Sequence, residues 1–175
     1  MLRPIQNPNY NRQEAYVVAD DAEDDYEIVK KWLLLAQEII KKRIYAATVY
    51  AEAAGQNRKS KQAVAHVMNN RIGKDGLWVD IEAVVSAPAQ FDGYGNSMYQ
   101  DAMNYYDTGI WTNSIERASM DECMSVIIPI YNGTEDDITG GALYFHSNPN
   151  PTDWRWHYDY TLIEVPGTEV FWFYK

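Results

Sequence analysis

The chain has a single cysteine among 175 residues, Cys123, so an internal disulfide is excluded. The apolar residues around Cys123 predict a buried small side chain rather than a catalytic thiol. No apolar run is long enough to span a membrane, and residues 1–26 lack the apolar stretch behind basic residues that marks a secretory signal. We therefore expect a protein made in soluble form, without a Sec signal.

Basic residues are scarce as well. The chain has 15 Lys and Arg against 25 Asp and Glu, which gives a formal net charge of −10. A surface with this charge repels nucleic acids and anionic membranes. We expect neither as a partner.

Signals for metal or cofactor chemistry are also missing. None of the three histidines, His66, His146 and His157, has a second ligand at metal-binding spacing, and no cluster of Cys and acids surrounds them. No Gly-x-Ser-x-Gly sequence positions a serine nucleophile. The sequence predicts no metal and no cofactor.

The hydrophobic pattern predicts an irregular arm over residues 1–19, followed by one domain over 20–175. From Asp20, apolar residues at helical spacing continue to Ala51, as one long helix or two that are broken near residues 41–43. Further helices are predicted over four shorter segments: 60–72, 81–86, 97–106 and 115–131. Pro129 should kink or end the last of them early.

After Gly140-Gly141 the pattern changes to short β-like runs over 143–146, 161–165 and 170–174. Pro166-Gly167 lies between the last two runs and predicts a hairpin. Helices followed by a small antiparallel sheet indicate the α+β class.

Glu52 is the residue whose setting points most clearly to catalysis. It lies in an apolar, small-residue stretch near the predicted end of the long helix, where Gly55 would form a left-handed C-cap. A carboxylate there faces the negative end of the helix dipole, which raises its pKa. A surface Glu that reaches solvent or pairs with an Arg is the alternative interpretation.

The size of the dipole effect shows that burial is needed too. Lifting a Glu pKa to ~6.5 takes about 3 kcal/mol, whereas a helix end contributes roughly 0.3–1 kcal/mol. Tyr45 and Val49 lie on the same helical face as Glu52 and would supply the desolvation. A general acid requires a pKa raised in this way.

Five further motifs follow the segment Tyr50-Ala51-Glu52-Ala53-Ala54-Gly55 along the chain. They are Asn70-Arg71, Gln90-Phe91, the run Gly141-Ala142-Leu143-Tyr144-Phe145, Trp154, and the closing Thr161-Leu162-Ile163 with Gly167 and Val170-Phe171. In this order and spacing, between about Ile39 and Tyr174, the chain resembles the SleB/CwlJ cell wall hydrolase family of peptidoglycan-degrading enzymes.

The chain departs from the family's pattern beside the acid. Family members usually have Gly where this chain has Ala51, Arg at Ala54 and a second acid at Gln56. Glu52 itself is kept. These departures bear on rate, pH optimum and substrate preference more than on the type of reaction.

The resemblance implies a mainly helical lysozyme-like domain that cleaves glycan strands between N-acetylmuramic acid and N-acetylglucosamine. Glu52 would be catalytic, and a single Glu suits a lytic transglycosylase that forms 1,6-anhydro-muramic ends. Substrate contacts are expected from residues that combine flat apolar faces with polar groups: Gln90, Phe91, Tyr144, His146, Asn148 and Trp154. Because the net charge is negative, binding would depend on the neutral sugars.

Two alternatives stay open. The chain could be a hydrolytic muramidase in which Asp92 or Asp153 is the second carboxylate, or a non-catalytic peptidoglycan-binding module. Such a protein would act after lysis, within a spore, or through a dedicated export route. The acidic N-terminal region before Val29 would be available to an inhibitor or a carrier protein.

Overall fold

The computed structural model describes residues 22–76, 78–147, 159–168 and 170–175, and the predicted arm over 1–19 lies outside them. These residues form a mostly helical structure with a small antiparallel sheet, which confirms the α+β class. The helices are α1 (Ala22–Ala53), α2 (Arg58–Arg71), α3 (Ile81–Val85), α4 (Ser97–Thr108) and α5 (Ser114–Tyr131), with a short 3-10 turn at Lys74–Gly76. The strands are β1 (Tyr144–His146), β2 (Leu162–Ile163) and β3 (Trp172–Tyr174).

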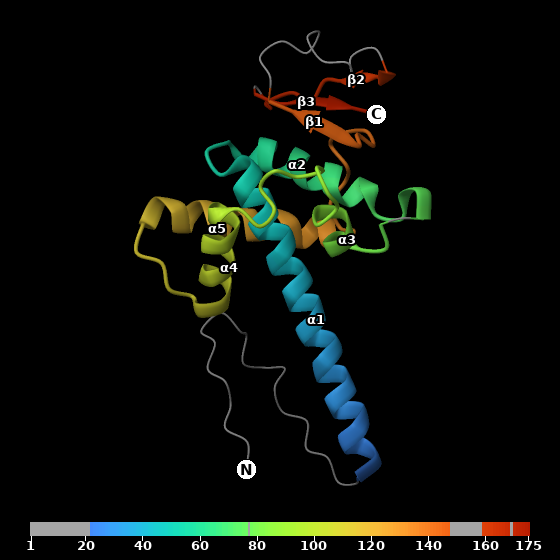
Figure 1. The fold of residues 1–175 in the computed structure, drawn as a ribbon, viewed down its shortest axis with the longest axis vertical. Helices are drawn as coiled ribbons and strands as arrows, with labels where there is room; N and C mark the ends of the chain where they lie inside the picture. The colour runs from blue at the N-terminus through green and yellow to red at the C-terminus, as the bar shows by residue number, and fades with distance from the viewer. Residues whose placement is uncertain (1–21, 77, 148–158, 169) are drawn as a thin grey trace.

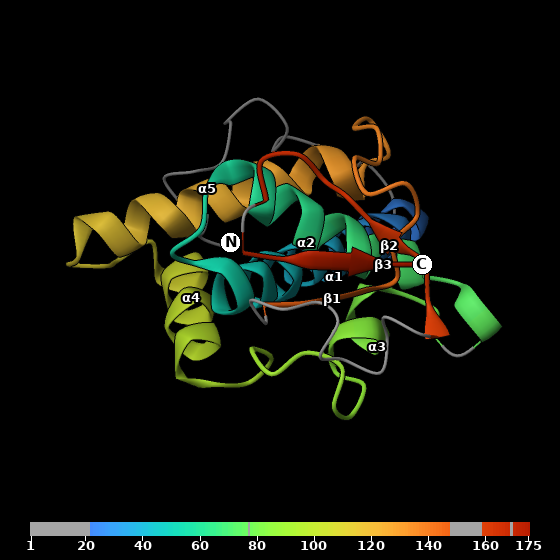
Figure 2. The same ribbon diagram turned by 90° about the horizontal axis from the view of Figure 1, so that it is seen from above.

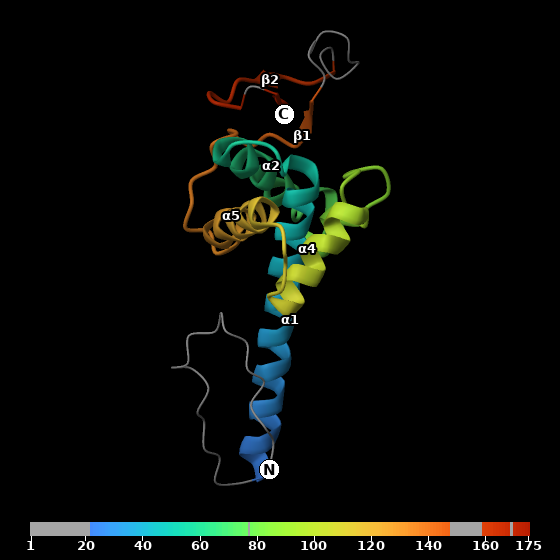
Figure 3. The same ribbon diagram turned by 90° about the vertical axis from the view of Figure 1, so that its left-hand side faces the viewer.

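Helix α1 is one continuous helix of 32 residues, which confirms the first of the two predicted alternatives and excludes a break near residues 41–43. The three basic residues at this level are good helix formers, and each contacts another part of the fold. Lys41 pairs with Asp80 at 3.3 Å and Arg43 with Asp107 at 2.5 Å. The N-terminal half of α1 extends away from the other helices, opposite the sheet (Figures 1 and 3). No helix among the described residues has the length and apolar character of a membrane-spanning segment.

Local capping explains where most of the helices begin and end. Asn57 accepts a hydrogen bond from the Ser60 amide and starts α2. Gly55 does not adopt the predicted left-handed conformation. The chain instead closes α1 with a hydrogen bond from the Gln56 amide to the Ala53 carbonyl and turns at once toward Asn57.

Pro129 does not end α5 early, so the predicted early end is wrong. The helix continues through Pro129 to Tyr131. A proline lacks the amide donor for the bond to the carbonyl four residues back, and its ring crowds that carbonyl. Pro129 is the third residue from the end of α5, so only the last turn is affected. The Asn132 amide donates to the Ile128 carbonyl one turn back, and the helix then closes at Asn132-Gly133 as the sequence indicates.

The core is built around the C-terminal half of α1. Residues 44–50 are buried between α2, α3, α4 and α5. Tyr45 is fully buried, and its hydroxyl donates to the Ala65 carbonyl at 2.5 Å, which ties α1 to α2. Cys123 on α5 lies in the same core, as predicted.

The sheet has the order β1-β3-β2, with both pairs antiparallel. The hairpin predicted between the last two strands is confirmed, although the strands are shorter than predicted. Phe145 on β1 contacts Phe171 and Phe173, with ring centroids 5.4 and 6.3 Å away. The sheet lies over α2 and therefore above the end of α1 that carries Glu52 (Figure 2).

Candidate functional site

Glu52 lies in the last turn of α1, as predicted, and its side chain is half-buried. Its Oε1 accepts a hydrogen bond from the Gly93 amide at 2.5 Å. Gly93 belongs to the loop between α3 and α4, which crosses the end of α1. The carboxyl group is therefore held by backbone, and no Lys or Arg is paired with it among the described residues.

Gly93 allows this close approach because it has no side chain. A Cβ atom at this position would lie 2.8 Å from both Ala51 Cβ and Glu52 Oε1. Real Cβ atoms do not approach other heavy atoms so closely, so the loop would have to move away. Contact between the loop and the catalytic candidate thus depends on glycine here.

The pKa of Glu52 is raised above the ordinary glutamate value. Burial is the main cause, and the nearby negative charge of Asp92 adds to it, while the hydrogen bond from the Gly93 amide acts in the opposite direction. The fully buried Tyr45 and Val49 precede Glu52 on the same helix. The direction agrees with the prediction that desolvation must supplement the helix dipole.

Arg71 forms a second centre next to this loop. It is 3% exposed at the end of α2, and its guanidinium group donates to the Leu143 carbonyl at 2.6 Å and to Gln90 Oε1 at 2.9 Å. The group also lies over the rings of Phe91 at 4.8 Å and Tyr144 at 5.2 Å. One cation therefore holds three of the predicted substrate-binding residues together.

The loop segment 90–93 links the two centres. Gln90 and Phe91 contact Arg71, whereas Gly93 contacts Glu52. Asp92, between them, is exposed. Four consecutive residues therefore connect the catalytic candidate with the aromatic and amide groups expected to bind sugar.

The predicted substrate-binding residues differ in how far they are exposed. Gln90 and Tyr144 are half-buried, and Tyr144 also contacts the ring of Tyr160 at 4.6 Å. Phe91 is buried beneath Arg71. His146 is buried too: its ring stacks on Tyr174 at 5.4 Å, and its Nε2 lies 3.1 Å from the Tyr174 hydroxyl. The surroundings of Phe91 and His146 are thus those of core residues.

Three of the candidate catalytic and substrate-binding residues lie outside the described part of the chain. They are Asn148, Trp154 and the candidate second acid Asp153. Conversely, Gly93 and the role of Arg71 were not predicted. Arg71 was visible only as part of the Asn70-Arg71 motif, and nothing in the sequence near Gly93 indicates contact with Glu52.

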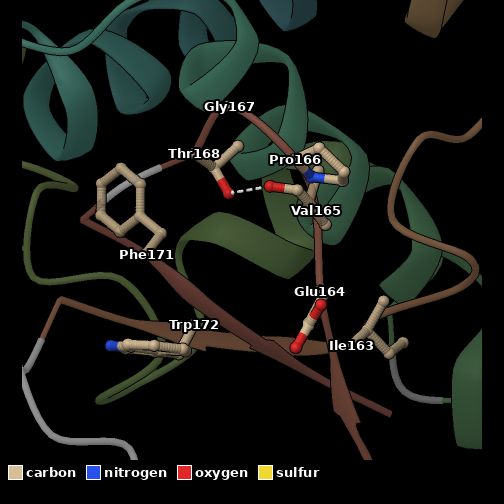
Figure 4. Close-up of a pocket in the computed structure, with 8 residues that line it drawn as sticks. All are labelled: Ile163, Glu164, Val165, Pro166, Gly167, Thr168, Phe171 and Trp172. Carbon is tan, nitrogen blue, oxygen red and sulfur yellow. Dashed lines mark hydrogen bonds between the residues drawn. The ribbon is translucent and has the colours of Figure 1, made fainter.

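A pocket of about 330 Å³ opens on the β2–β3 hairpin. It is lined by Ile163, Glu164, Val165, Pro166, Gly167, Thr168, Phe171 and Trp172 (Figure 4). None of these residues was predicted to bind substrate. Contacts between the Phe171, Phe145 and Phe91 rings connect the pocket to the Arg71 centre, with centroids 5.4 and 6.2 Å apart.

Ionisable groups elsewhere in the described part of the chain show no metal site. Within the described ranges, no group of three or more His, Cys, Asp and Glu side chains is arranged to hold a metal ion. His66 faces Asp137 at 3.6 Å, and burial lowers the pKa of this histidine. This pair connects α2 to the segment before β1.

Of three comparisons with known proteins, one finds a match. Searches among curated proteins and among solved structures find no match. A family model described as Cell Wall Hydrolase matches residues 55–172, more than half of the chain, and includes Arg71, Gln90, Gly93 and Tyr144. The match begins at residue 55, shortly after Glu52, so the role of Glu52 is inferred from its burial and its hydrogen bond to Gly93. The chain belongs to the cell wall hydrolase family, which acts on peptidoglycan.

Proposed function

We propose that this protein is a lytic transglycosylase that cuts peptidoglycan between N-acetylmuramic acid and N-acetylglucosamine, with Glu52 as its single acid and base. The observation that carries the proposal is the state of the Glu52 carboxyl group. It is half-buried, has a raised pKa, and is oriented by a backbone donor at 2.5 Å. Such a group stays protonated closer to neutral pH than an exposed glutamate does.

In the proposed reaction, protonated Glu52 donates its proton to the glycosidic oxygen as the bond from that oxygen to muramic C1 breaks. The muramic N-acetyl oxygen stabilises the positive charge that develops at C1. The Glu52 carboxylate then accepts the proton of the C6 hydroxyl as O6 bonds to C1. No water is consumed, and Glu52 ends the cycle protonated.

The hydrogen bond from Gly93 suits both halves of this cycle. The amide can donate to one carboxyl oxygen, Oε1, in either protonation state, which leaves the other oxygen for the exchanged proton. Burial favours the neutral acid before cleavage, and the amide limits how far the pKa rises. The same amide stabilises the carboxylate formed in the first step, which then accepts the second proton.

Sugar binding is assigned to the groups gathered around Arg71. The Gln90 amide is held by Arg71 through its oxygen, and its NH2 group lies 3.4 Å from the Pro88 carbonyl. That NH2 group has a second N–H for a ligand oxygen. Tyr144 supplies an aromatic face of the kind that packs against sugar C–H groups. Asn148 and Trp154 stay as proposed contacts from the segment that follows β1.

The test is product analysis on purified sacculi, with wild-type protein and the Glu52→Gln variant side by side. Mass spectrometry of the wild-type digest should show 1,6-anhydro-muramic ends, and the variant should release almost no fragments. Near-wild-type release by Glu52→Gln would refute the role of Glu52. Binding of sacculi without any release by the wild type would indicate a non-catalytic module.

A muramidase is the second candidate because Asp92 is close enough to raise the pKa of Glu52. In that reaction Asp92 would stabilise the positive charge at C1 or activate a water molecule, and the products would carry reducing muramic ends. The same mass spectra distinguish the two reactions, since hydrolysis adds the mass of water to each cleaved end.

A further inference from the structure

The N-terminal half of α1, residues 25–40, is called the N-terminal rod below. Seven of its large apolar side chains are exposed: Tyr26, Val29, Trp32, Leu33, Leu34, Leu35 and Ile40. Among the described residues, its only hydrogen bond to another element runs from the Tyr131 hydroxyl to Glu38 near its base. A surface helix of a monomer normally exposes polar residues, so seven exposed large apolar side chains along one half of a helix indicate an interface.

The spacing of the apolar residues specifies the kind of partner. Tyr26, Val29, Leu33, Ala36 and Ile40 are separated by three and four residues alternately. This is the heptad pattern by which one helix packs along another. At 1.5 Å per residue the rod is about 24 Å long, enough for two heptads of contact.

The charges specify the orientation of that partner. The tip of the rod carries Asp25 and Glu27, both exposed, of which Glu27 pairs with Lys30 at 3.5 Å, and Lys41 and Lys42 lie just beyond its base. The two lysines already contact Asp80 and the Tyr131 ring, at 3.3 and 5.3 Å, and stay partly exposed. A parallel pair would place like charges together, whereas an antiparallel pair brings each acidic tip to the basic base of the other helix.

We infer that two copies of this chain associate through their N-terminal rods, as an antiparallel helix pair centred near Leu33. The occupant of the apolar face is thus a second copy of the protein, since the same helix supplies both the apolar stripe and the complementary charges. Glu52 lies at the opposite end of α1 from the tip of the rod. Antiparallel pairing therefore directs the two Glu52 sites to opposite ends of the assembly.

The first test measures the mass of the full chain in solution. Sedimentation velocity over a range of concentrations should show a dimer, and Leu33→Glu should weaken its association at least tenfold. The matched control is Ile115→Glu, which places the same charge at an apolar residue of α5 that is 80% exposed. The control should stay dimeric, and circular dichroism should show that both variants keep their helix content.

A second test measures orientation by disulfide cross-linking, for which the buried Cys123 is a silent background. In an antiparallel pair centred near Leu33, the two copies of residue 33 lie close together, so Leu33→Cys should form a disulfide between the chains. The two copies of residue 29 lie on opposite sides of the centre, so Val29→Cys should not. A wild-type protein that stays monomeric at every concentration would overturn the inference, whatever else binds the rod. Efficient self-cross-linking of Val29→Cys would overturn the antiparallel arrangement. Neither test depends on lytic activity, so a failed proposal for Glu52 leaves them unaffected.

Discussion

The two halves of α1 have similar apolar content but opposite surroundings. In the C-terminal half, Tyr45 is fully buried and alanines at 46 and 47 allow neighbouring helices to approach closely. In the N-terminal half, Tyr26 is 69% exposed and Leu33 is 61% exposed. Small side chains and partners from four helices, rather than hydrophobicity alone, thus decide which half belongs to the core. Glu52 owes its raised pKa to its place at the end of the buried half.

The largest difference between the two halves should appear in activity. Glu52→Gln removes the proton donor and should lower the rate of glycan cleavage by about 10²–10⁴-fold. Glu27→Gln makes the same change in the exposed half of the same helix and should leave the rate unchanged. Turbidity loss of purified sacculi, with equal amounts of folded protein, measures both. Equal loss in the two variants would mean that Glu52 has no special role.

The next difference should appear in stability. Tyr45→Ala removes a fully buried ring and its hydrogen bond to Ala65. It should lower the free energy of unfolding by about 3–5 kcal/mol. Tyr26→Ala should change it by less than about 0.5 kcal/mol when the protein is dilute. Urea denaturation followed by circular dichroism gives both values. A large loss for Tyr26→Ala in dilute protein would show that the N-terminal half is covered within one chain.

A smaller loss of cleavage rate is expected when one of two glycines near the end of the buried half is replaced by alanine, but not when the other is. Gly93→Ala places a methyl group 2.8 Å from Glu52 Oε1, so the loop must move and lose its hydrogen bond to the acid. A displacement of this size can lower the rate by up to about 10²-fold. Gly55→Ala is the control, because nothing lies within 4 Å of its added methyl group and its φ is not positive. The cleavage rate of Gly55→Ala should be unchanged. A loss equal to that of Gly93→Ala would show that any change near the end of α1 lowers the rate.

The sequence predicted the elements of this fold better than the contacts between them. Helical periodicity and caps are local properties, so α2 to α5 and the three strands lie close to their predicted positions. The interaction of Gly93 with Glu52 spans 41 positions, and that of Arg71 with Gln90 spans 19. No local pattern encodes such contacts.

The unbroken α1 has the same explanation. Its polar stretch at Lys41 and Arg43 looks like an interruption until the distant Asp80 and Asp107 are seen to pair with it. The prediction for Glu52 came closest in its position in the last turn of the helix, which is a local property of α1. Its burial depends on the helices packed around α1, and its catalytic role stays a prediction. Even there, the loop that orients the carboxyl group came only from the structure.

The smallest expected effect concerns Asp92, which adds to the raised pKa of Glu52 less than burial does. A general acid must be protonated to donate, so activity falls as the pH rises through its pKa. Removing the negative charge in Asp92→Asn lowers the pKa of Glu52 and should move this alkaline limb to lower pH, while activity at acidic pH is kept. Asp136→Asn, an exposed acid on the segment after α5, should leave the profile unchanged. A loss of activity at every pH in Asp92→Asn would instead make Asp92 the second carboxylate of a muramidase, because a lyase needs only the acid that α1 presents.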